Sequence, residues 1–386
     1  MDAAPPDTGP SLAARGAYIV NTLANCKFCH TPKLPNGQPD LDKNFSGVDC
    51  WADIDSPTGT DDGGSVGCLS TRNLTPDPTG LGNVTDQQIK DAFLNGIRTD
   101  GKKLVPVMPW WILHNMTDDD ADAVVAYLRS IPPIAHQVKP NQPPWSLYND
   151  GVPDILPDPS PLAVNTIPMP GPGANMESAM RGRYLASVAG LCIDCHTPET
   201  SPNSLQLDSS RFFAGGRLFS KEQLGLLDPS YPNLIATGNL TTDATGLKGW
   251  TKDQIKAALS EGRDRDNNSV CASAHGNLTS SYASLEPQDL EDIVEYISHL
   301  PAVANDVAND PNVANCGLPA LPLAVGAPET GAQCDDTMDN DGDGTVNDGC
   351  PETGTDCSNT ADDDGDGVPN DGCPVACGNC AGPPVP

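Results

Sequence analysis

An internal repeat constrains the fold of this chain more than any other feature. The segment NLTPDPTGLGNVTDQQIKDAFLNG (residues 73–96) recurs as NLTTDATGLKGWTKDQIKAALSEG (residues 239–262), with an offset of 166 residues. The same offset relates Tyr18 to Tyr184. A repeat of this length indicates a tandem duplication, so the interpretation of each half can be checked against the other.

Each half also carries one C-x-x-C-H motif, CKFCH in the first and CIDCH in the second. This spacing is typical of covalent haem attachment, because two thiols add to the two vinyl groups of one porphyrin and the next histidine comes to lie beneath the iron. A redox dithiol or half of a zinc site is the alternative, but two motifs in matching contexts favour haem. We predict two haem c groups attached to Cys26, Cys29, Cys192 and Cys195, with His30 and His196 as axial ligands.

Helical patterns surround both motifs in the same order. The predicted helices cover residues 12–24, 117–131, 178–189 and 286–300, together with the helix inside each repeat. That inner helix begins in both copies with a T-x-x-Q capping box, at Thr85 and at Thr251, in which each side chain satisfies a free backbone N–H of the other residue. No long alternating pattern indicates a substantial sheet, so we expect both halves to be helical throughout.

The order helix, CxxCH, loop, NLTPD, helix, PVMPW and DADAVVAYLRSIPP resembles the cytochrome c fold. More narrowly, it is similar to the dihaem and trihaem cytochrome c subunits that accept electrons from periplasmic alcohol and related dehydrogenases. The resemblance covers residues 12–135 and 178–305. It implies a mainly α protein with two tandem cytochrome c-like domains, which transfers electrons between redox partners and is not itself an enzyme.

In this family a methionine before the last helix usually occupies the axial position opposite the histidine. Met108, in VPVMPWW, matches that place. Thioether ligation raises the reduction potential relative to ligation by two histidines. His114 and Met116 are rival ligands, and a methionine that merely fills the core is the alternative interpretation.

The second half departs from this pattern, because no methionine occurs between residues 181 and 337. Met108 projects onto residues 274–277, and His275 lies within that window. We therefore predict His275 as the second axial ligand of the second haem. An open iron, a ligand from a neighbouring molecule and Cys271 remain alternatives. A bis-histidine haem beside a His/Met haem would give electron flow a preferred direction.

Composition indicates which segments connect the predicted domains. Residues 136–176 are rich in proline and predict a stiff linker that drapes over both halves or simply spaces them. Cys50 and Cys68 lie in an insertion of the first half, and we expect them to form a disulfide that pins this loop. The predicted boundaries are residues 1–135 and 177–305 for the haem domains, 306–333 for a second linker and 334–386 for a tail.

The tail contains an acidic repeat. CDDTMDNDGDGTVNDGCP recurs as CSNTADDDGDGVPNDGCP, and its D-x-D-x-D spacing resembles the calcium loops of thrombospondin type 3 repeats. Flanking cysteines favour an irregular tail stabilised by disulfides and calcium over a merely solvated acidic one. The predicted calcium ligands are Asp339, Asp341, Asp343, the carbonyl of Thr345 and Asp348, then Asp362, Asp364, Asp366, the carbonyl of Val368 and Asp371.

The charge of the chain bears on its partners. The net charge is -31, and no Lys or Arg follows Arg265. This imbalance argues against nucleic acid and favours redox partners with basic docking faces. No apolar run is long enough to span a membrane, and the amino terminus does not resemble a signal peptide. The 14 cysteines indicate an oxidising compartment, so we expect the mature form of an exported protein that is periplasmic, cell-surface or extracellular.

Two alternative functions remain at this point. A dihaem peroxidase would need an open sixth position at the second haem. A subunit of an extracellular conductive filament would self-associate through the tail or through the second haem.

Overall fold

The computed structural model describes residues 11–34, 39–53, 67–143, 145–146, 160–200, 206–220, 234–265 and 281–307. By its contacts the chain divides into residues 1–318 and residues 319–386, and every described residue belongs to the first unit. The predicted ligand His275 and the predicted calcium loops, from Asp339 to Asp371, lie outside the described residues.

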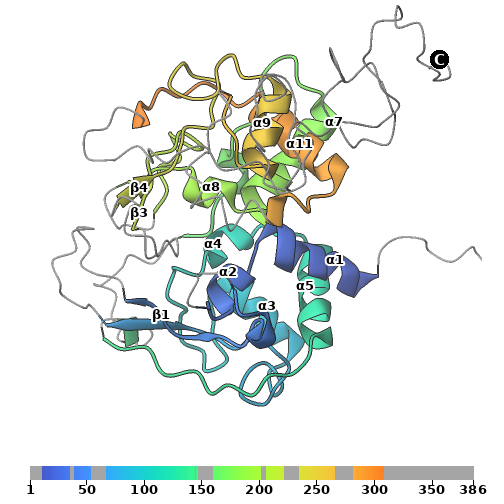
Figure 1. The fold of residues 1–386 in the computed structure, drawn as a ribbon, viewed down its shortest axis with the longest axis vertical. Helices are drawn as coiled ribbons and strands as arrows, with labels where there is room; N and C mark the ends of the chain where they lie inside the picture. The colour runs from blue at the N-terminus through green and yellow to red at the C-terminus, as the bar shows by residue number, and fades with distance from the viewer. Residues whose placement is uncertain are drawn as a thin grey trace, which may run out of the picture. The chain divides into compact units, whose positions relative to one another are not determined.

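The first half, residues 11–146, is mainly helical (Figure 1). Its elements are α1 (Leu12–Tyr18), the π-helical turn η1 (Ile19–Leu23), α2 (Lys27–His30), the 3-10 turn η2 (Leu41–Lys43), β1 (Val48–Asp53), β2 (Cys68–Thr71), α3 (Asp86–Asn95), α4 (Trp110–Leu113) and α5 (Asp118–Ser130).

The second half, residues 160–307, repeats the order of these helices, except that its described residues contain no counterpart of α4 or η2. Its elements are the 3-10 turn η3 (Val164–Thr166), α7 (Met176–Tyr184), the π-helical turn η4 (Leu185–Ala189), α8 (Cys192–Cys195), β3 (Leu218–Ser220), β4 (Leu234–Ala236), α9 (Lys252–Ser260) and α11 (Pro287–Ile297). None of the helices in the described ranges combines the length and the apolar character that crossing a membrane requires.

The capping boxes form as expected. The Thr85 hydroxyl accepts a hydrogen bond from the Gln88 N–H, and the Gln88 side chain accepts one from the Thr85 N–H at 3.0 Å. Thr251 and Gln254 repeat this arrangement at the start of α9. Both helices therefore begin where the sequence predicts.

Each half also contains a two-stranded antiparallel sheet, so the expectation of halves without strands is wrong in this detail. β1 pairs with β2, and β3 pairs with β4. The expected disulfide between Cys50 and Cys68 joins β1 to β2. These strands are too short and irregular to produce a readable alternation of apolar and polar residues.

One glycine in each half allows the long helices to cross closely. α1 packs against α5 and α7 packs against α11. A Cβ atom on Gly16 would lie 1.8 Å from the Ala123 carbonyl oxygen, and one on Gly182 would lie 1.7 Å from that of Asp292. Because any side chain would overlap backbone atoms, both crossings require glycine.

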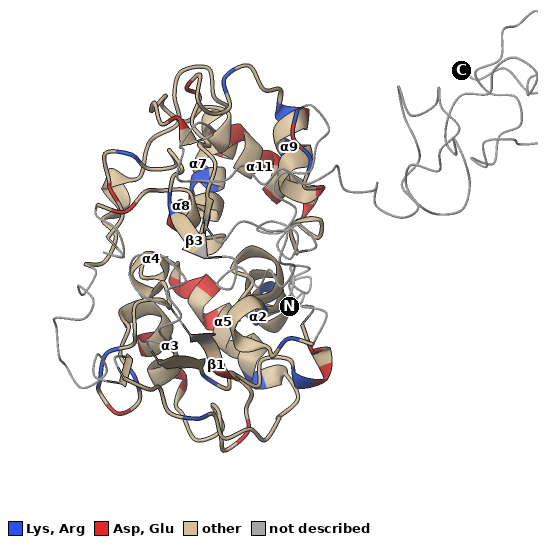
Figure 2. Cartoon of the chain, turned by 60° about the vertical axis from the view of Figure 1, so that its left-hand side comes forward, with Lys and Arg blue, Asp and Glu red and all other residues tan. Residues whose placement is uncertain are grey.

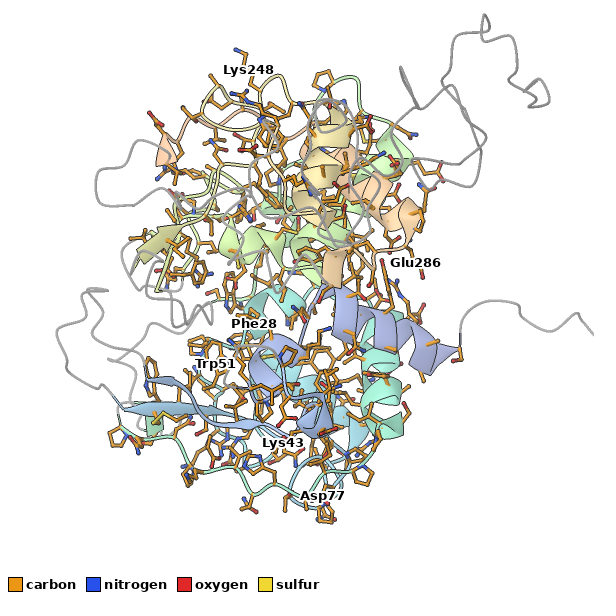
Figure 3. The ribbon with its side chains drawn as sticks, viewed as in Figure 1. Phe28, Lys43, Trp51, Asp77, Lys248 and Glu286 are labelled. Atoms are coloured by element: carbon orange, nitrogen blue, oxygen red, sulfur yellow. A yellow bond between two sulfur atoms is a disulfide. The ribbon has the colours of Figure 1, made fainter. Side chains whose placement is uncertain are left out.

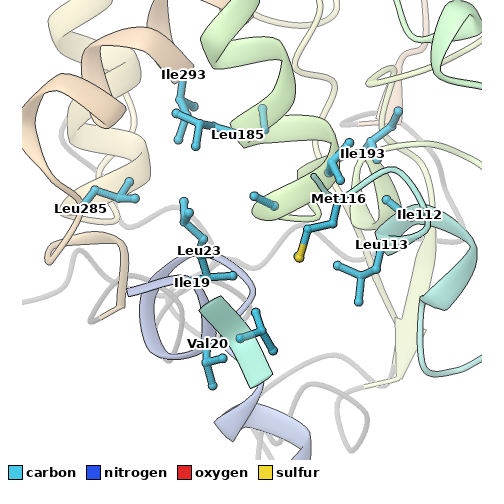
Figure 4. Close-up of a cluster of buried hydrophobic side chains, with 14 of the residues drawn as sticks. Ile19, Val20, Leu23, Ile112, Leu113, Met116, Leu185, Ile193, Leu285 and Ile293 are labelled. Carbon is cyan, nitrogen blue, oxygen red and sulfur yellow. The ribbon is translucent and has the colours of Figure 1, made fainter. Parts of the chain in front are cut away.

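The main hydrophobic core extends across both halves. Figure 4 shows Ile19 and Leu23 of η1 close to Leu185 of η4 and to Leu285, which precedes α11. The two turns that lead into the CxxCH motifs thus belong to one packed interior.

The described part of the proline-rich linker bonds to both halves. The Leu162 N–H donates to the Trp111 carbonyl oxygen at 2.8 Å. Further along, the Arg183 guanidinium donates to the Ile167 carbonyl oxygen at 2.7 Å. Residues 160–171 therefore drape over both halves rather than merely spacing them.

Candidate haem-binding sites

The two CxxCH motifs have matching local structure. Each follows a π-helical turn, a deformation that is common at functional sites. The residue before the first cysteine has a positive φ in both halves, 43° at Asn25 and 57° at Leu191. This backbone conformation is uncommon for residues other than glycine, and its repetition indicates that the surroundings hold both motifs in one defined shape.

The four cysteines of the motifs form no disulfide, and Cys26 and Cys192 pack against the main hydrophobic core. Burial raises the pKa of all four thiols to about 12. They are therefore neutral thiols at physiological pH.

The two motifs lie near each other. After burial, the carboxylate of Asp194 raises the pKa of Cys195, and Cys29 of the other half adds to the same shift. Asp194 in turn contributes to the raised pKa of Cys29. These contributions indicate that the second cysteines of the two motifs lie on the sides of the two halves that approach each other. Figure 3 places Phe28, inside the first motif, on the side of the first half that faces the second half.

The proximal histidines are oriented in the same way. Nδ1 of His30 bonds to the Arg72 carbonyl oxygen, and Nδ1 of His196 bonds to that of Gly238, both at 2.8 Å. Because a carbonyl oxygen is an acceptor, Nδ1 carries the hydrogen and Nε2 carries the lone pair that a metal needs. Burial lowers the pKa of both rings, which favours the neutral, ligating form.

The repeated NLT sequence holds the carbonyl groups that orient these rings. Asn73, directly after Arg72, donates from its side chain to the Ile134 carbonyl oxygen at 2.8 Å. Asn239 donates to the Val303 carbonyl oxygen at 2.9 Å. Each asparagine thereby ties the residue before it to the segment that follows the last helix. Sequence reasoning used this repeat to align the halves but missed its role at the histidine.

A threonine after each histidine completes the proximal side. The Thr31 hydroxyl accepts a hydrogen bond from the Phe45 N–H at 3.0 Å, and the Thr197 hydroxyl accepts one from the Phe213 N–H at 3.1 Å. Both phenylalanines are fully buried with a positive φ, 61° and 63°. The sequence CHTP, which both halves share, could have indicated this role of the threonine.

The three candidate second ligands of the first half lie in different surroundings. Met108 is half-buried and packs against the main core. His114 is exposed, and its Nδ1 bonds to the Leu94 carbonyl oxygen at 2.9 Å at the end of α3. Met116 is packed in the core shown in Figure 4. The outward placement of His114 weakens its candidacy relative to Met108.

The residues present fit the chemistry of haem. Each half offers two thiols and a neutral imidazole in the required order. Trp110 and Trp111, which follow Met108 closely, have buried indole N–H groups without an acceptor among the described residues. A buried donor normally has a partner, and the carboxylates of a porphyrin would supply acceptors.

Comparisons with known proteins show the family of this chain. The paired CxxCH segments and their oriented histidines define a c-type cytochrome. No family model matches the chain. It is 30% identical over 354 residues to the cytochrome c subunit of quinone alcohol dehydrogenase from Gluconacetobacter polyoxogenes, covering 88% of this chain and 68% of that subunit. The corresponding subunit of Gluconobacter oxydans is 28% identical over 306 residues, which cover 77% of this chain and 56% of the relative.

A diheme c-type cytochrome of Cereibacter sphaeroides is 25% identical over 244 residues, covering 61% of this chain and 73% of that protein. The chain belongs to the family of cytochrome c subunits of quinone alcohol dehydrogenases. Haem c is therefore the cofactor that the cysteines and histidines described above are suited to bind.

Proposed function

We propose that this chain binds one haem c in each half and carries electrons from a dehydrogenase to a further redox protein, without a catalytic activity of its own. The observation that carries the proposal is the matched pair of CxxCH sites with identically oriented histidines, brought together in one interior. A quinone-dependent alcohol dehydrogenase is the donor suggested by the relatives.

Each part of the site has a role in this function. A bound haem supplies an iron that takes up and releases one electron. The cysteine pairs hold it covalently, while the carbonyl oxygens of Arg72 and Gly238 keep the proximal rings in the ligating tautomer. We propose Met108 as the second axial ligand in the first half and His275 in the second. Unequal ligand sets would give unequal potentials.

The halves and the tail complete the proposal. We assign residues 1–135 and 177–305 as the haem domains, with residues 136–176 and 306–333 as linkers. We assign residues 334–386 as a tail that binds calcium through the aspartates between Asp339 and Asp371, a proposal that its sequence repeat supports. The Cys50–Cys68 disulfide supports export to an oxidising compartment.

The test compares the protein, purified from cells that mature c-type cytochromes, with a His275→Ala variant. A pyridine haemochrome assay is expected to give two haems per chain. Low-temperature EPR and the near-infrared spectrum are expected to show one His/Met haem and one bis-histidine haem, and the latter becomes high-spin in the variant. A second haem that is already high-spin and binds peroxide before mutation would favour the peroxidase alternative.

A further inference from the structure

Two tyrosines cross between the halves in a reciprocal arrangement. The Tyr18 hydroxyl donates to Asp289 Oδ2 of the second half at 2.9 Å. The Tyr184 hydroxyl donates to Asp120 Oδ2 of the first half at 2.7 Å. The tyrosines are equivalent in the repeat, and so are the aspartates near the start of the two final helices. The contact therefore has approximate twofold symmetry.

The same hydroxyl groups also accept hydrogen bonds from the partner half. The Glu286 N–H donates to the Tyr18 hydroxyl at 3.1 Å, and the Thr117 N–H donates to the Tyr184 hydroxyl at 3.3 Å. Glu286 and Thr117 are the N-cap residues of α11 and α5. Each tyrosine hydroxyl is therefore hydrogen-bonded to the beginning of the final helix of the other half. Figure 3 shows Glu286 where the halves meet, and Figure 2 shows acidic residues gathered where α5 begins.

An arginine from the same half completes each cluster. Arg15 forms a bidentate ion pair with Asp120, with Nε–Oδ1 at 2.8 Å and Nη2–Oδ2 at 3.0 Å. Arg181, the equivalent residue of the second half, pairs with Asp289 through one nitrogen and with Asp292 through another. The Arg15 guanidinium also lies over the Tyr18 ring, 5.6 Å from its centroid, and so joins the two clusters into one network.

The burial of these groups makes the network specific. The Asp289 side chain has no exposed surface, and that of Asp120 is 10% exposed. A buried carboxylate that loses a partner is strongly destabilised. Burial raises the pKa of Tyr184 to about 12 and that of Tyr18 as well, so both hydroxyls remain protonated donors. Apolar packing between the halves is non-directional, whereas these bonds specify one register.

The clusters act directly on the segments that carry the CxxCH motifs. Tyr18 is the last residue of α1, and η1 follows it and leads into Cys26. Tyr184 has the same place before η4 and Cys192. A shift of either tyrosine would move its motif relative to the other.

We propose that the two Arg–Asp–Tyr clusters hold the haem-binding segments at a fixed separation and thereby set the rate of electron transfer between the halves. Tyr18 and Tyr184 are positioning residues in this proposal, which rests on the proposed function. Electron transfer between fixed centres slows steeply as their separation grows, so a loosened interface would slow it even with both haems intact.

The test removes only the hydroxyl groups, in the Tyr18→Phe and Tyr184→Phe variants and in the double variant. Tyr127→Phe is the matched control, because the Tyr127 hydroxyl accepts its 2.9 Å hydrogen bond from Asn21 of the same half. Two quantities are measured: the magnetic coupling between the ferric haems by EPR, and the rate of electron transfer within the chain after flash reduction. The double variant is expected to show a broader range of separations and a rate at least tenfold lower.

The midpoint potential of each haem is expected to stay unchanged in every variant, which separates positioning from an altered haem pocket. Wild-type coupling and rate in the double variant would overturn the proposal. If the double variant does not fold, wild-type magnetic coupling and a wild-type transfer rate in both single variants would overturn the proposal. Failure of the proposed function is a different result, namely no covalent haem in the wild-type protein.

Discussion

The two halves of this protein share the arrangement around His30 and His196 and differ in the residue that we propose as the second axial ligand. His30 and His196 make the same hydrogen bond, at the same length, to carbonyl groups held by the same NLT sequence. On the distal side, the first half has Met108, and the second half has no methionine in the equivalent region.

The difference shows which parts of such a site can vary. In the proposed sites, covalent attachment would fix the proximal geometry, because two thiols and one imidazole must reach a single porphyrin. The second axial ligands that we propose, Met108 and His275, lie outside the CxxCH motifs, so this ligand could change without disturbing the attachment. A duplicated chain could therefore keep two matching haem-attachment segments and still give the two haems different reduction potentials.

Removal of one cysteine pair should have the largest effect, because it should remove the haem of one half and leave that of the other. Cys26→Ser with Cys29→Ser should leave only the haem of the second half, and Cys192→Ser with Cys195→Ser only that of the first. Each double variant should lose half of the haem content, because the thioether bonds are what retain the group. A pyridine haemochrome assay with a redox titration is the measurement. The two variants should titrate at different potentials, with the higher value in the variant that retains the first haem.

Equal potentials in these variants would mean that the distal difference has no electronic consequence. Full haem content in either variant would mean that its CxxCH motif does not attach a haem.

The sequence predicts the repeated parts of the molecule well. The helices around both motifs, the two capping boxes and the Cys50–Cys68 disulfide are confirmed, because each depends on local pattern or on a pair of isolated cysteines. The relatives agree with the expected class of electron-transfer subunit. The ligands Met108 and His275 and the calcium loops stay predictions.

Other features could not be read from the sequence. The short strand pairs have no alternation to detect. The bonds from Tyr18 and Tyr184 join residues far apart in the chain, and their partners are defined only once the halves have packed together. The repeat did mark both tyrosines, but a pattern within each half cannot show a contact between halves.

Substitution of the crossing glycines should give the next largest effect. Gly16→Ala and Gly182→Ala should each destabilise the fold by about 3 kcal/mol, because the new methyl group would overlap the backbone of the facing helix. Denaturant unfolding of the holoprotein measures this change. Wild-type stability of both variants would contradict the close crossings.

Loss of the disulfide should affect the first half alone. Cys50→Ser with Cys68→Ser should cost about 2–3 kcal/mol, since the bridge closes a loop with a sequence separation of 18. The second half has no equivalent bridge among its described residues, so its amide exchange should be unchanged. Hydrogen exchange read by mass spectrometry distinguishes the halves. Faster exchange in β3 and β4 as strong as that in β1 and β2 would show that the halves unfold as one unit.

The smallest effect is expected at the capping boxes, where the halves should respond equally. Thr85→Ala and Thr251→Ala each remove one hydroxyl acceptor at a helix start, and each should cost about 1 kcal/mol. Because α3 and α9 belong to copies of the same repeat, a difference well above 1 kcal/mol between the two variants would mean that the halves contribute unequally to the shared core. Thermal unfolding of both variants beside the wild-type protein gives this difference directly. Equal values would mean that the two helix starts contribute equally to the stability of the shared core.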